Sequence, residues 1–305
     1  MEPYFGSVAY VLATPPPLVE VKPTREVRTV APVNEVAVDG GRAATLVGAA
    51  RAWEYLLVWS PQGVVVRASL ACDTQESNVV LAGNRFAHVC FQGENYVVTG
   101  TLRPLKAHVA LRAAASALVA LAGRGALIAG SAGSTVWRFD AARRAKLKTY
   151  SNTAIVRNVD GDSILVDRNS TVLDVLSRTG LLRVTLRLPH SGGAVLHGNR
   201  IATIWRRRLI VSDLHGRTLL SRPVVAGGQL SDFDGSRVVY AVETRLHLLR
   251  VQDGRDVELR LRGQFGYATA KLSQGGLFYA YNTRSARAGR AGYVSAKAVR
   301  ALLRH

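Results

Sequence analysis

The chain has 305 residues, of which 48% are hydrophobic, so global disorder is excluded and a sizeable core is expected. With 40 basic and 21 acidic residues its formal net charge is +19, and such a surface attracts polyanions without specificity. No run of residues approaches the roughly 18 consecutive apolar positions that a transmembrane helix requires, and no secretory signal is visible. A cytoplasmic location and export with the signal removed both remain open.

The first 33 residues are expected to form an extended segment outside the main domain. Pro15, Pro16 and Pro17 follow one another, and proline lacks the amide hydrogen that a helix interior needs. Residues 25–30 are the most strand-like stretch of this segment. We therefore divide the chain into an N-terminal extended segment, residues 1–33, and one domain, residues 34–305.

From residue 34 onward one unit recurs seven times. Each copy is an apolar strand, a turn centred on glycine and a second strand of small and β-branched residues. The turns suit two-residue hairpins because glycine and asparagine tolerate positive φ. The glycines recur 37 to 43 residues apart, at Gly40, Gly83, Gly123, Gly161, Gly198, Gly235 and Gly275.

A second turn follows about 20 residues later in many units and joins an outer pair of strands, a spacing typical of propeller repeats. Examples are residues 60–63, 177–180, 213–216 and 252–254. Two hairpins give four strands in about 40 residues, which is the composition of a β-propeller blade. The sequence therefore predicts an all-β fold, a seven-bladed β-propeller.

The last unit lacks its fourth strand. Residues 267–272, 277–281 and 291–294 supply three strands, and residues 295–303 then read as a short C-terminal helix. The spare strand at residues 25–30 is expected to complete this blade beside Tyr293 and so to close the ring, because an open blade edge is a liability.

These units resemble the WD40-like and TolB-like β-propeller superfamily, in particular its bacterial-type members, from about Asn34 to the end of the chain. No unit has the Gly-His and Trp-Asp pairs of strict WD40 repeats. The resemblance implies a toroid with a central channel and two faces whose loops are free to bind partners. It implies no particular activity.

Binding groups in propellers gather at the channel mouth, where the innermost strands begin. We take polar residues shortly before the turn glycines as candidate ligand-binding residues. The alternative is that they are ordinary solvated loop positions. The candidates are Asn34, Glu35, Glu76, Asn78, His190, Gln229 and Tyr267.

A basic rim is a second candidate site. Arg206, Arg207 and Arg208 follow Trp205 in the turn between the second and third strands of unit five, and Arg143 and Arg144 lie in unit three. Together they would offer cations and aromatic rings to phosphates. A solvated turn is the competing explanation.

Two cysteines, Cys72 and Cys90, are too few for a disulfide scaffold or a zinc site. The repeat places them in neighbouring units, where a single disulfide is geometrically possible, and two buried thiols are the alternative. The histidines show none of the metal-binding spacings, and no Gly-x-Ser-x-Gly nucleophile elbow occurs. We expect no metal and no cofactor.

Three functions remain open at this stage. The first is a non-enzymatic binding scaffold, a monomer, for a protein, peptide or glycan, and the lack of a catalytic signature favours it. The second is a propeller enzyme of lyase or hydrolase type that works through Glu35, Glu76 and His190 at the channel mouth. The third is a basic propeller that binds nucleic acid or another polyanion.

Overall fold

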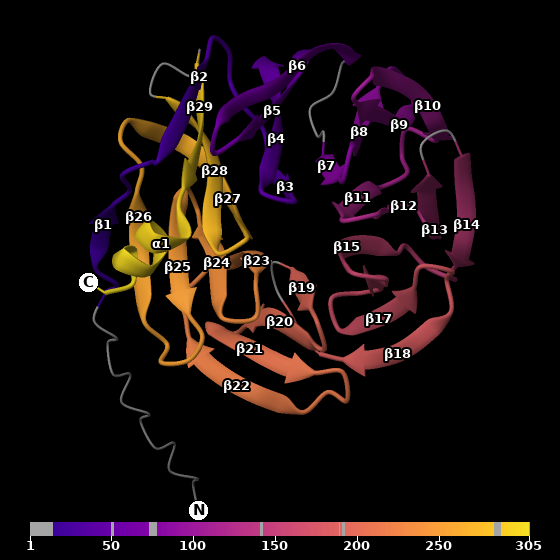
Figure 1. Cartoon of the computed structure of the whole chain (residues 1–305). Coiled ribbons are helices and arrows are strands. Elements are labelled where there is room, and N and C mark those ends of the chain that lie inside the picture. Colours follow the sequence, from indigo (N-terminus) through magenta and orange to yellow (C-terminus); the bar gives the residue numbers. More distant parts are fainter. Residues whose placement is uncertain are drawn as a thin grey trace, which may run out of the picture.

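The computed structural model describes residues 15–49, 52–72, 78–140, 143–188, 190, 193–283 and 288–304. These residues form seven antiparallel sheets, or blades, arranged in a ring around a central channel (Figure 1). In each blade a meander of consecutive strands runs outward from the channel, and the N-terminal segment adds an outer strand to two of the blades. The prediction of a seven-bladed β-propeller is confirmed.

The first four blades take their strands in chain order. Blade one consists of β3 (Ala37–Asp39), β4 (Arg42–Ala49), β5 (Ala52–Ser60) and β6 (Gly63–Cys72), and blade two of β7 (Val79–Ala82), β8 (Arg85–Phe91), β9 (Asn95–Leu102) and β10 (Leu105–Ala113). Blade three consists of β11 (Val119–Arg124), β12 (Leu127–Ala132), β13 (Thr135–Asp140) and β14 (Arg143–Thr149), and blade four of β15 (Ile155–Asp160), β16 (Ser163–Asp167), β17 (Val172–Ser177) and β18 (Leu182–Arg187).

The remaining blades include the two that take strands from the N-terminal segment. Blade five consists of β19 (Ala194–His197), β20 (Arg200–Trp205), β21 (Arg208–Asp213) and β22 (Thr218–Pro223). Blade six consists of β23 (Gln229–Phe233), β24 (Arg237–Val242), β25 (Arg245–Arg250), β26 (Asp256–Arg260) and β1 (Leu18–Glu20). Blade seven consists of β27 (Gln264–Ser273), β28 (Gly276–Thr283), β29 (Gly289–Val294) and β2 (Arg25–Thr29).

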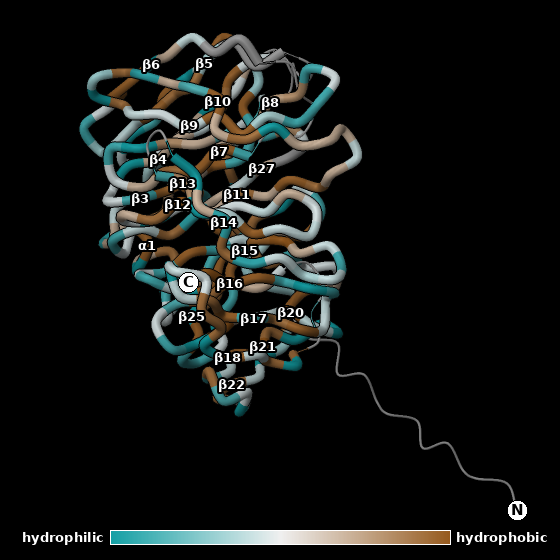
Figure 2. Tube along the Cα trace, turned by 90° about the vertical axis from the view of Figure 1, so that its right-hand side faces the viewer, coloured by the Kyte–Doolittle hydropathy of each residue, from teal (hydrophilic) through white to brown (hydrophobic). Residues whose placement is uncertain are grey.

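The hydrophobic core lies between neighbouring blades rather than in one central mass. Leu46 and Leu56 of blade one, for example, pack with Leu81 and Phe86 of blade two, and all four are at most 1% exposed. Figure 2 shows hydrophobic segments running through the strands, with many hydrophilic residues in the loops at the two faces. Because every blade contributes one side of two such cores, the ring is stable only when it is closed.

Ring closure follows the predicted register. β2 pairs antiparallel with β29, and Arg25 lies opposite Tyr293. A tyrosine on β28 adds a contact that sequence reasoning missed: the hydroxyl of Tyr279 lies 3.4 Å from a carboxylate oxygen of Glu26 on β2. A Cβ on Gly292 would lie only 2.3 Å from the Tyr279 ring, so the ring reaches β2 only because β29 has glycine there.

β1 was not predicted. It pairs in parallel with β26 at the outer edge of blade six, and Val21, just after it, is 4% exposed. Three residues after a proline run carry too little periodicity to be recognised as a strand. The N-terminal segment therefore joins two blades.

The C-terminal helix is confirmed as α1 (Ala296–Leu302). The side chain of Ser295 caps it by accepting a hydrogen bond from the amide of Ala298, as an N-cap serine commonly does. Val299 and Leu302 are buried, and α1 contacts β28. No helix among the described residues is long and apolar enough to cross a membrane.

One turn differs from the predicted repeat. In the turn between β11 and β12 the glycine with positive φ is Gly125, at +60°, whereas Gly123 lies within β11 opposite Ile128. The turn on Gly123 was therefore wrong by two residues, because Gly123-Arg124-Gly125 offers two glycines to the same pattern. A Cβ at Gly123 would approach the carbonyl of Leu81 in blade two to 2.9 Å, which explains the second glycine.

The turns after the innermost strands tie neighbouring blades together. Arg42 donates to the carbonyl of Gly83 at 2.6 Å, and Arg237 donates to that of Gly275 at the same distance. The carboxylate of Asp39 accepts from the amides of Gly83, at 2.6 Å, and Gly125, at 2.8 Å. Several arginines of this basic chain thus serve the ring itself.

Candidate functional site: the central channel

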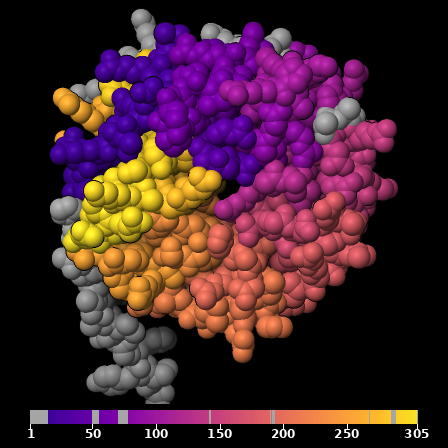
Figure 3. Space-filling view, in the orientation of Figure 1, coloured from indigo at the N-terminus to yellow at the C-terminus, as the bar shows by residue number. Residues whose placement is uncertain are grey.

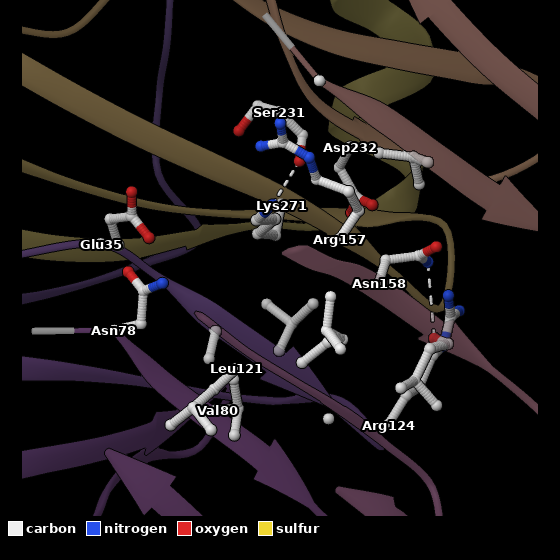
Figure 4. A pocket seen from close by; sticks show the side chains of 18 of the residues that line it. Glu35, Asn78, Val80, Leu121, Arg124, Arg157, Asn158, Ser231, Asp232 and Lys271 are labelled. Atoms are coloured by element: carbon white, nitrogen blue, oxygen red, sulfur yellow. Dashed lines mark hydrogen bonds between the residues drawn. The ribbon is translucent and has the colours of Figure 1, made fainter. Parts of the chain in front are cut away.

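The innermost strands surround a central cavity of about 310 Å³. Figure 3 shows its opening as a narrow hollow near the centre of one face. Apolar side chains such as Val80 and Leu121 form part of the wall. The polar and charged lining side chains, labelled in Figure 4, are Glu35, Asn78, Arg124, Arg157, Asn158, Ser231, Asp232 and Lys271.

Asn158 joins blade four to blade five. Its side-chain amide accepts from the backbone amide of Leu196 at 2.9 Å and donates to the carbonyl of Leu196 at 3.0 Å. The side chain thus completes the hydrogen bonds of an inner strand that has no neighbour in its own sheet on that side. Both of its polar atoms are used in holding the ring together.

A similar set of bonds joins blades six and seven. Asp232 accepts from the amide of Leu272 at 2.6 Å, Ser231 donates to the carbonyl of Ala270 at 2.8 Å, and Lys271 donates to the carbonyl of Ser231. Burial raises the pKa of Asp232, although the nearby Lys271 charge and the Leu272 amide act in the opposite direction.

Arg157 is held from behind by a buried carboxylate. Its Nη2 lies 2.6 Å from Asp167, which is 2% exposed and also lies 3.0 Å from Nε2 of His190. Nδ1 of His190 lies 3.0 Å from the carbonyl of Leu188. Both ring nitrogens of His190 therefore lie within hydrogen-bond distance of an oxygen atom.

This chain of charges lowers the pKa of Asp167. Burial alone would raise it, but hydrogen bonds from His190, Arg157 and the amide of Ser170 outweigh burial and hold the pKa well below its usual range. Asp167 is therefore ionised and fixes the direction in which Arg157 enters the channel.

Only part of the predicted channel-mouth set reaches the channel. Glu35 and Asn78 line it, whereas His190 is 2% exposed and lies behind Arg157. Gln229 is an exposed residue at the start of β23. The backbone amide of Asn34 donates to the carbonyl of Leu46, and the carbonyl of Asn34 accepts from the hydroxyl of Thr45. Tyr267 lies in β27, and its side chain is outside the described part. Glu76 lies outside the described residues.

Five of the six polar channel residues that sequence reasoning missed share a position, and the sixth, Arg124, lies beside the turn of blade three. Arg157, Asn158, Ser231, Asp232 and Lys271 stand three or four places before the turn glycine of their blade. A polar residue there interrupts an otherwise apolar inner strand, and that interruption was the available signal. The predicted candidates were taken five to eight places before the glycine, and these positions lie at or before the start of the inner strand.

The structure places the two halves of the predicted basic rim at opposite faces. Arg206 and Arg207 form the turn that joins β20 to β21, whereas Arg143 and Arg144 begin β14 after the other type of hairpin. Since successive strands are antiparallel and all blades start at the same face, these hairpins lie at opposite ends of the sheets. Each half keeps an aromatic partner: Arg144 lies 5.3 Å from the Trp137 ring and Arg206 lies 5.5 Å from the Trp205 ring.

The cysteine pair is only partly described. Cys90, in β8, is disulfide-bonded, and Cys72 is the other cysteine of the chain. The side chain of Cys72 lies outside the described part, so the Cys72–Cys90 pairing stays a prediction. Within the described residues no group of three or more His, Cys, Asp or Glu side chains could hold a metal ion.

Comparisons with known proteins define the class of the fold. No family model and no curated protein matches the sequence. The β-propeller domain of Cps50 (Swd1) from Myceliophteria thermophila matches with a TM-score of 0.61 and 12% identity over 90% of this chain and 99% of that one. A chain of the mitotic checkpoint complex matches with a TM-score of 0.58 and 14% identity over 93% and 98%.

A third solved structure gives a similar result. KlHsv2 with its loop 6CD replaced by a Gly-Ser linker matches with a TM-score of 0.58 and 11% identity over 83% of this chain and 90% of that one. The chain is thus a β-propeller whose fold is similar to that of these solved structures. At these identities the likeness concerns the fold alone.

Proposed function

We propose that the chain is a non-enzymatic binding scaffold whose exposed loop faces engage a protein, peptide or glycan partner. The observation that carries this proposal is the use of the channel's polar groups. Asn158, Ser231, Asp232 and Lys271 each bond to the backbone of a neighbouring blade. Groups committed in this way hold the ring closed and are poor candidates for substrate chemistry, which leaves the loop faces for recognition.

The enzyme alternative has little support from the described residues. It needs Glu35, Glu76 and His190 around one cavity, but His190 is buried and paired with Asp167. A general base must come within hydrogen-bond reach of the proton that it removes. The monomeric state and the TolB-like type stay predictions.

A crosslinking experiment tests the scaffold proposal. The purified chain, carrying a photoreactive group, is incubated with extract of its source cells, and the crosslinked residues are located by mass spectrometry. We expect a saturable partner whose crosslinks map to the loop faces and whose capture is unchanged in Glu35→Gln and Asn78→Ala. Loss of capture in these two channel variants, or a turnover activity that requires Glu35, would contradict the proposal.

Polyanion binding is the second candidate, and the outer strand of blade three favours it. β14 carries Arg143, Arg144, Lys146 and Lys148, and none of the four has an ion pair among the described residues. Arg143, Arg144 and Lys146 are exposed. Such a row would follow a phosphate backbone.

The salt dependence of binding to a 20-nucleotide oligothymidylate tests the second candidate. If β14 forms the site, Arg143→Gln with Lys146→Gln reduces the slope of log K against log salt by about 1.4, because each phosphate contact on a single strand contributes about 0.7. Arg67→Gln with Arg260→Gln removes the same charge from exposed positions of β6 and β26 and is the control. An equal change in the control would mean that net charge alone attracts the oligonucleotide.

A further inference from the structure

A second hollow, apart from the channel, lies at the face that carries α1. Its volume is about 560 Å³, and blade five, blade six and the C-terminal helix all contribute to it. Figure 1 shows α1 in front of β25, and Figure 3 shows the C-terminal residues, in yellow, on this face. The charged residues of its lining are all arginines: Arg200, Arg237, Arg250, Arg300 and Arg304.

Two of these arginines are already paired. Arg237 bonds to Asp234 and to the carbonyl of Gly275, and Arg250 bonds to Asp253. Both arginines line the hollow, and each is neutralised by an aspartate of its own turn, Asp234 for Arg237 and Asp253 for Arg250.

The other three arginines are not paired with any described group. Arg200 begins β20, Arg300 lies in the last turn of α1, and Arg304 follows α1; all three are exposed. The side chain of none of them has a hydrogen bond or ion pair within the described part of the chain. Three guanidinium groups without a hydrogen bond or ion pair among the described residues therefore line one hollow.

Arginine is the side chain that matches phosphate and carboxylate groups in shape. Its planar fork donates two parallel hydrogen bonds to two oxygens, and it stays charged at all physiological pH values. A phosphorylated side chain brings a charge of about −1.5 to −2 and three acceptor oxygens in a small volume. The charge and the three oxygens of a phosphate group therefore match three guanidinium groups whose side chains have no partner among the described residues.

The surroundings favour a compact anion over a long polyanion. Asp253 follows Gln252, which lines the hollow, and Asp213 lies opposite Arg200 in the pairing of β20 with β21. Both carboxylates are engaged by arginines of their own turns, Arg250 and Arg217. A nucleic-acid strand that ran across this face would meet those carboxylates, whereas one phosphate on a flexible peptide enters between them. Blade five, blade six and the C-terminal helix all line the hollow, so its shape suits a small group better than an extended nucleic-acid strand.

We propose that this hollow binds a phosphorylated side chain of a partner protein through Arg200, Arg300 and Arg304. The inference rests on the proposed scaffold function and adds the chemistry of the partner. It gives α1 a role beyond packing against β28, since α1 and the residues after it bring Arg300 and Arg304 to the hollow that Arg200 also lines. Blade five, blade six and the C-terminal helix thereby contribute to one site.

Fluorescence anisotropy at about 150 mM salt, a physiological ionic strength, tests this proposal with a labelled octapeptide of glycine and alanine that carries one phosphoserine. We expect saturable binding that is at least tenfold weaker for the serine and glutamate versions of the peptide. The triple variant Arg200→Gln, Arg300→Gln, Arg304→Gln should lose at least tenfold in affinity, and millimolar inorganic phosphate should compete.

The control variant is Arg67→Gln, Arg187→Gln, Arg260→Gln, which removes three exposed arginines from the outer strands of blades one, four and six. It should change the affinity less than twofold. An equal loss in the control, equal binding of the glutamate peptide, or tighter binding of a ten-nucleotide oligothymidylate that depends on the same three arginines would overturn the proposal.

Two further comparisons keep the outcomes distinct. The unfolding midpoint of the triple variant should match that of the control variant. If the triple variant is destabilised, the single variants Arg200→Gln and Arg304→Gln take its place, and each should weaken binding of the phosphopeptide. If the phosphopeptide does not bind but the crosslinking experiment still captures a partner on the loop faces, only this inference fails. If neither is observed, the scaffold function fails as well.

Discussion

A chain that lacks residues 1–33 is expected to lose about 5 kcal/mol of unfolding free energy, measured by urea denaturation. The truncation removes β2 from blade seven together with the buried side chains of Val21, Val27 and Val33. A fully buried valine contributes about 1.5 to 2 kcal/mol, and the loss of β2 also leaves the edge of β29 unpaired. Arg290 and Tyr279 lose Glu26 as a partner at the same time.

Shorter truncations separate the two strands of the segment. Removal of residues 1–22 takes away β1 and Val21 only, and we expect a loss of about 2 kcal/mol, one buried valine with a short strand. Removal of residues 1–14 takes away none of the described contacts and is the control. If the 1–33 truncation unfolds at the same urea concentration as the full chain, β2 does not stabilise the closed ring, and residues 1–33 do not contribute to the unfolding free energy of the domain.

Local patterns were sufficient to predict the ring. The glycine turns recur at nearly constant spacing, and each is flanked by strands, so the number of blades follows from counting. The pairing of β2 followed from a mismatch: the last unit lacked one strand and the N-terminus had one to spare. Closure is a global property, but in a repeat protein it is visible as a missing piece of the repeat.

The sites were harder to predict because they depend on which blades become neighbours. His190 looked like a channel-mouth residue by its distance from Gly198, yet it turns inward to Asp167, a contact that no repeat pattern encodes. Arg200 and Arg304 are about a hundred positions apart in the sequence and meet only because the ring brings the end of the chain back over blade six. Each of these arginines alone looks like an ordinary surface charge.

Many polar side chains of the inner strands and their turns bond to a neighbouring blade. Those on the inner strands, such as Asn158 and Asp232, bond to the next blade, and those in the turns after the inner strands, such as Asp39 and Arg42, do the same at one face. Each of these bonds replaces a backbone partner that a strand or turn would otherwise lack. Unpaired arginines such as Arg200 stand out against this background, which is why they are the better guide to binding.

The substitution Asp167→Asn is expected to lower the unfolding free energy by about 3 kcal/mol at pH 7. Removing one member of a buried polar network leaves its partners without compensation, here the ring of His190 and the guanidinium of Arg157. Asp140→Asn makes the same chemical change at a carboxylate whose side chain is 49% exposed, and as a surface pair it should cost less than 1 kcal/mol.

The pH dependence of this difference follows from the lowered pKa of Asp167. A carboxylate whose pKa is depressed in the folded state stabilises the fold above its unfolded pKa, about 3.9, and this stabilisation disappears as the pH falls toward the folded value. The gap between the wild-type chain and Asp167→Asn should therefore narrow as the pH falls from 5 to 3. Urea denaturation at pH 5, 4 and 3 measures this gap, and a gap that widens over that range would show that Asp167 is not the ionised centre of this network.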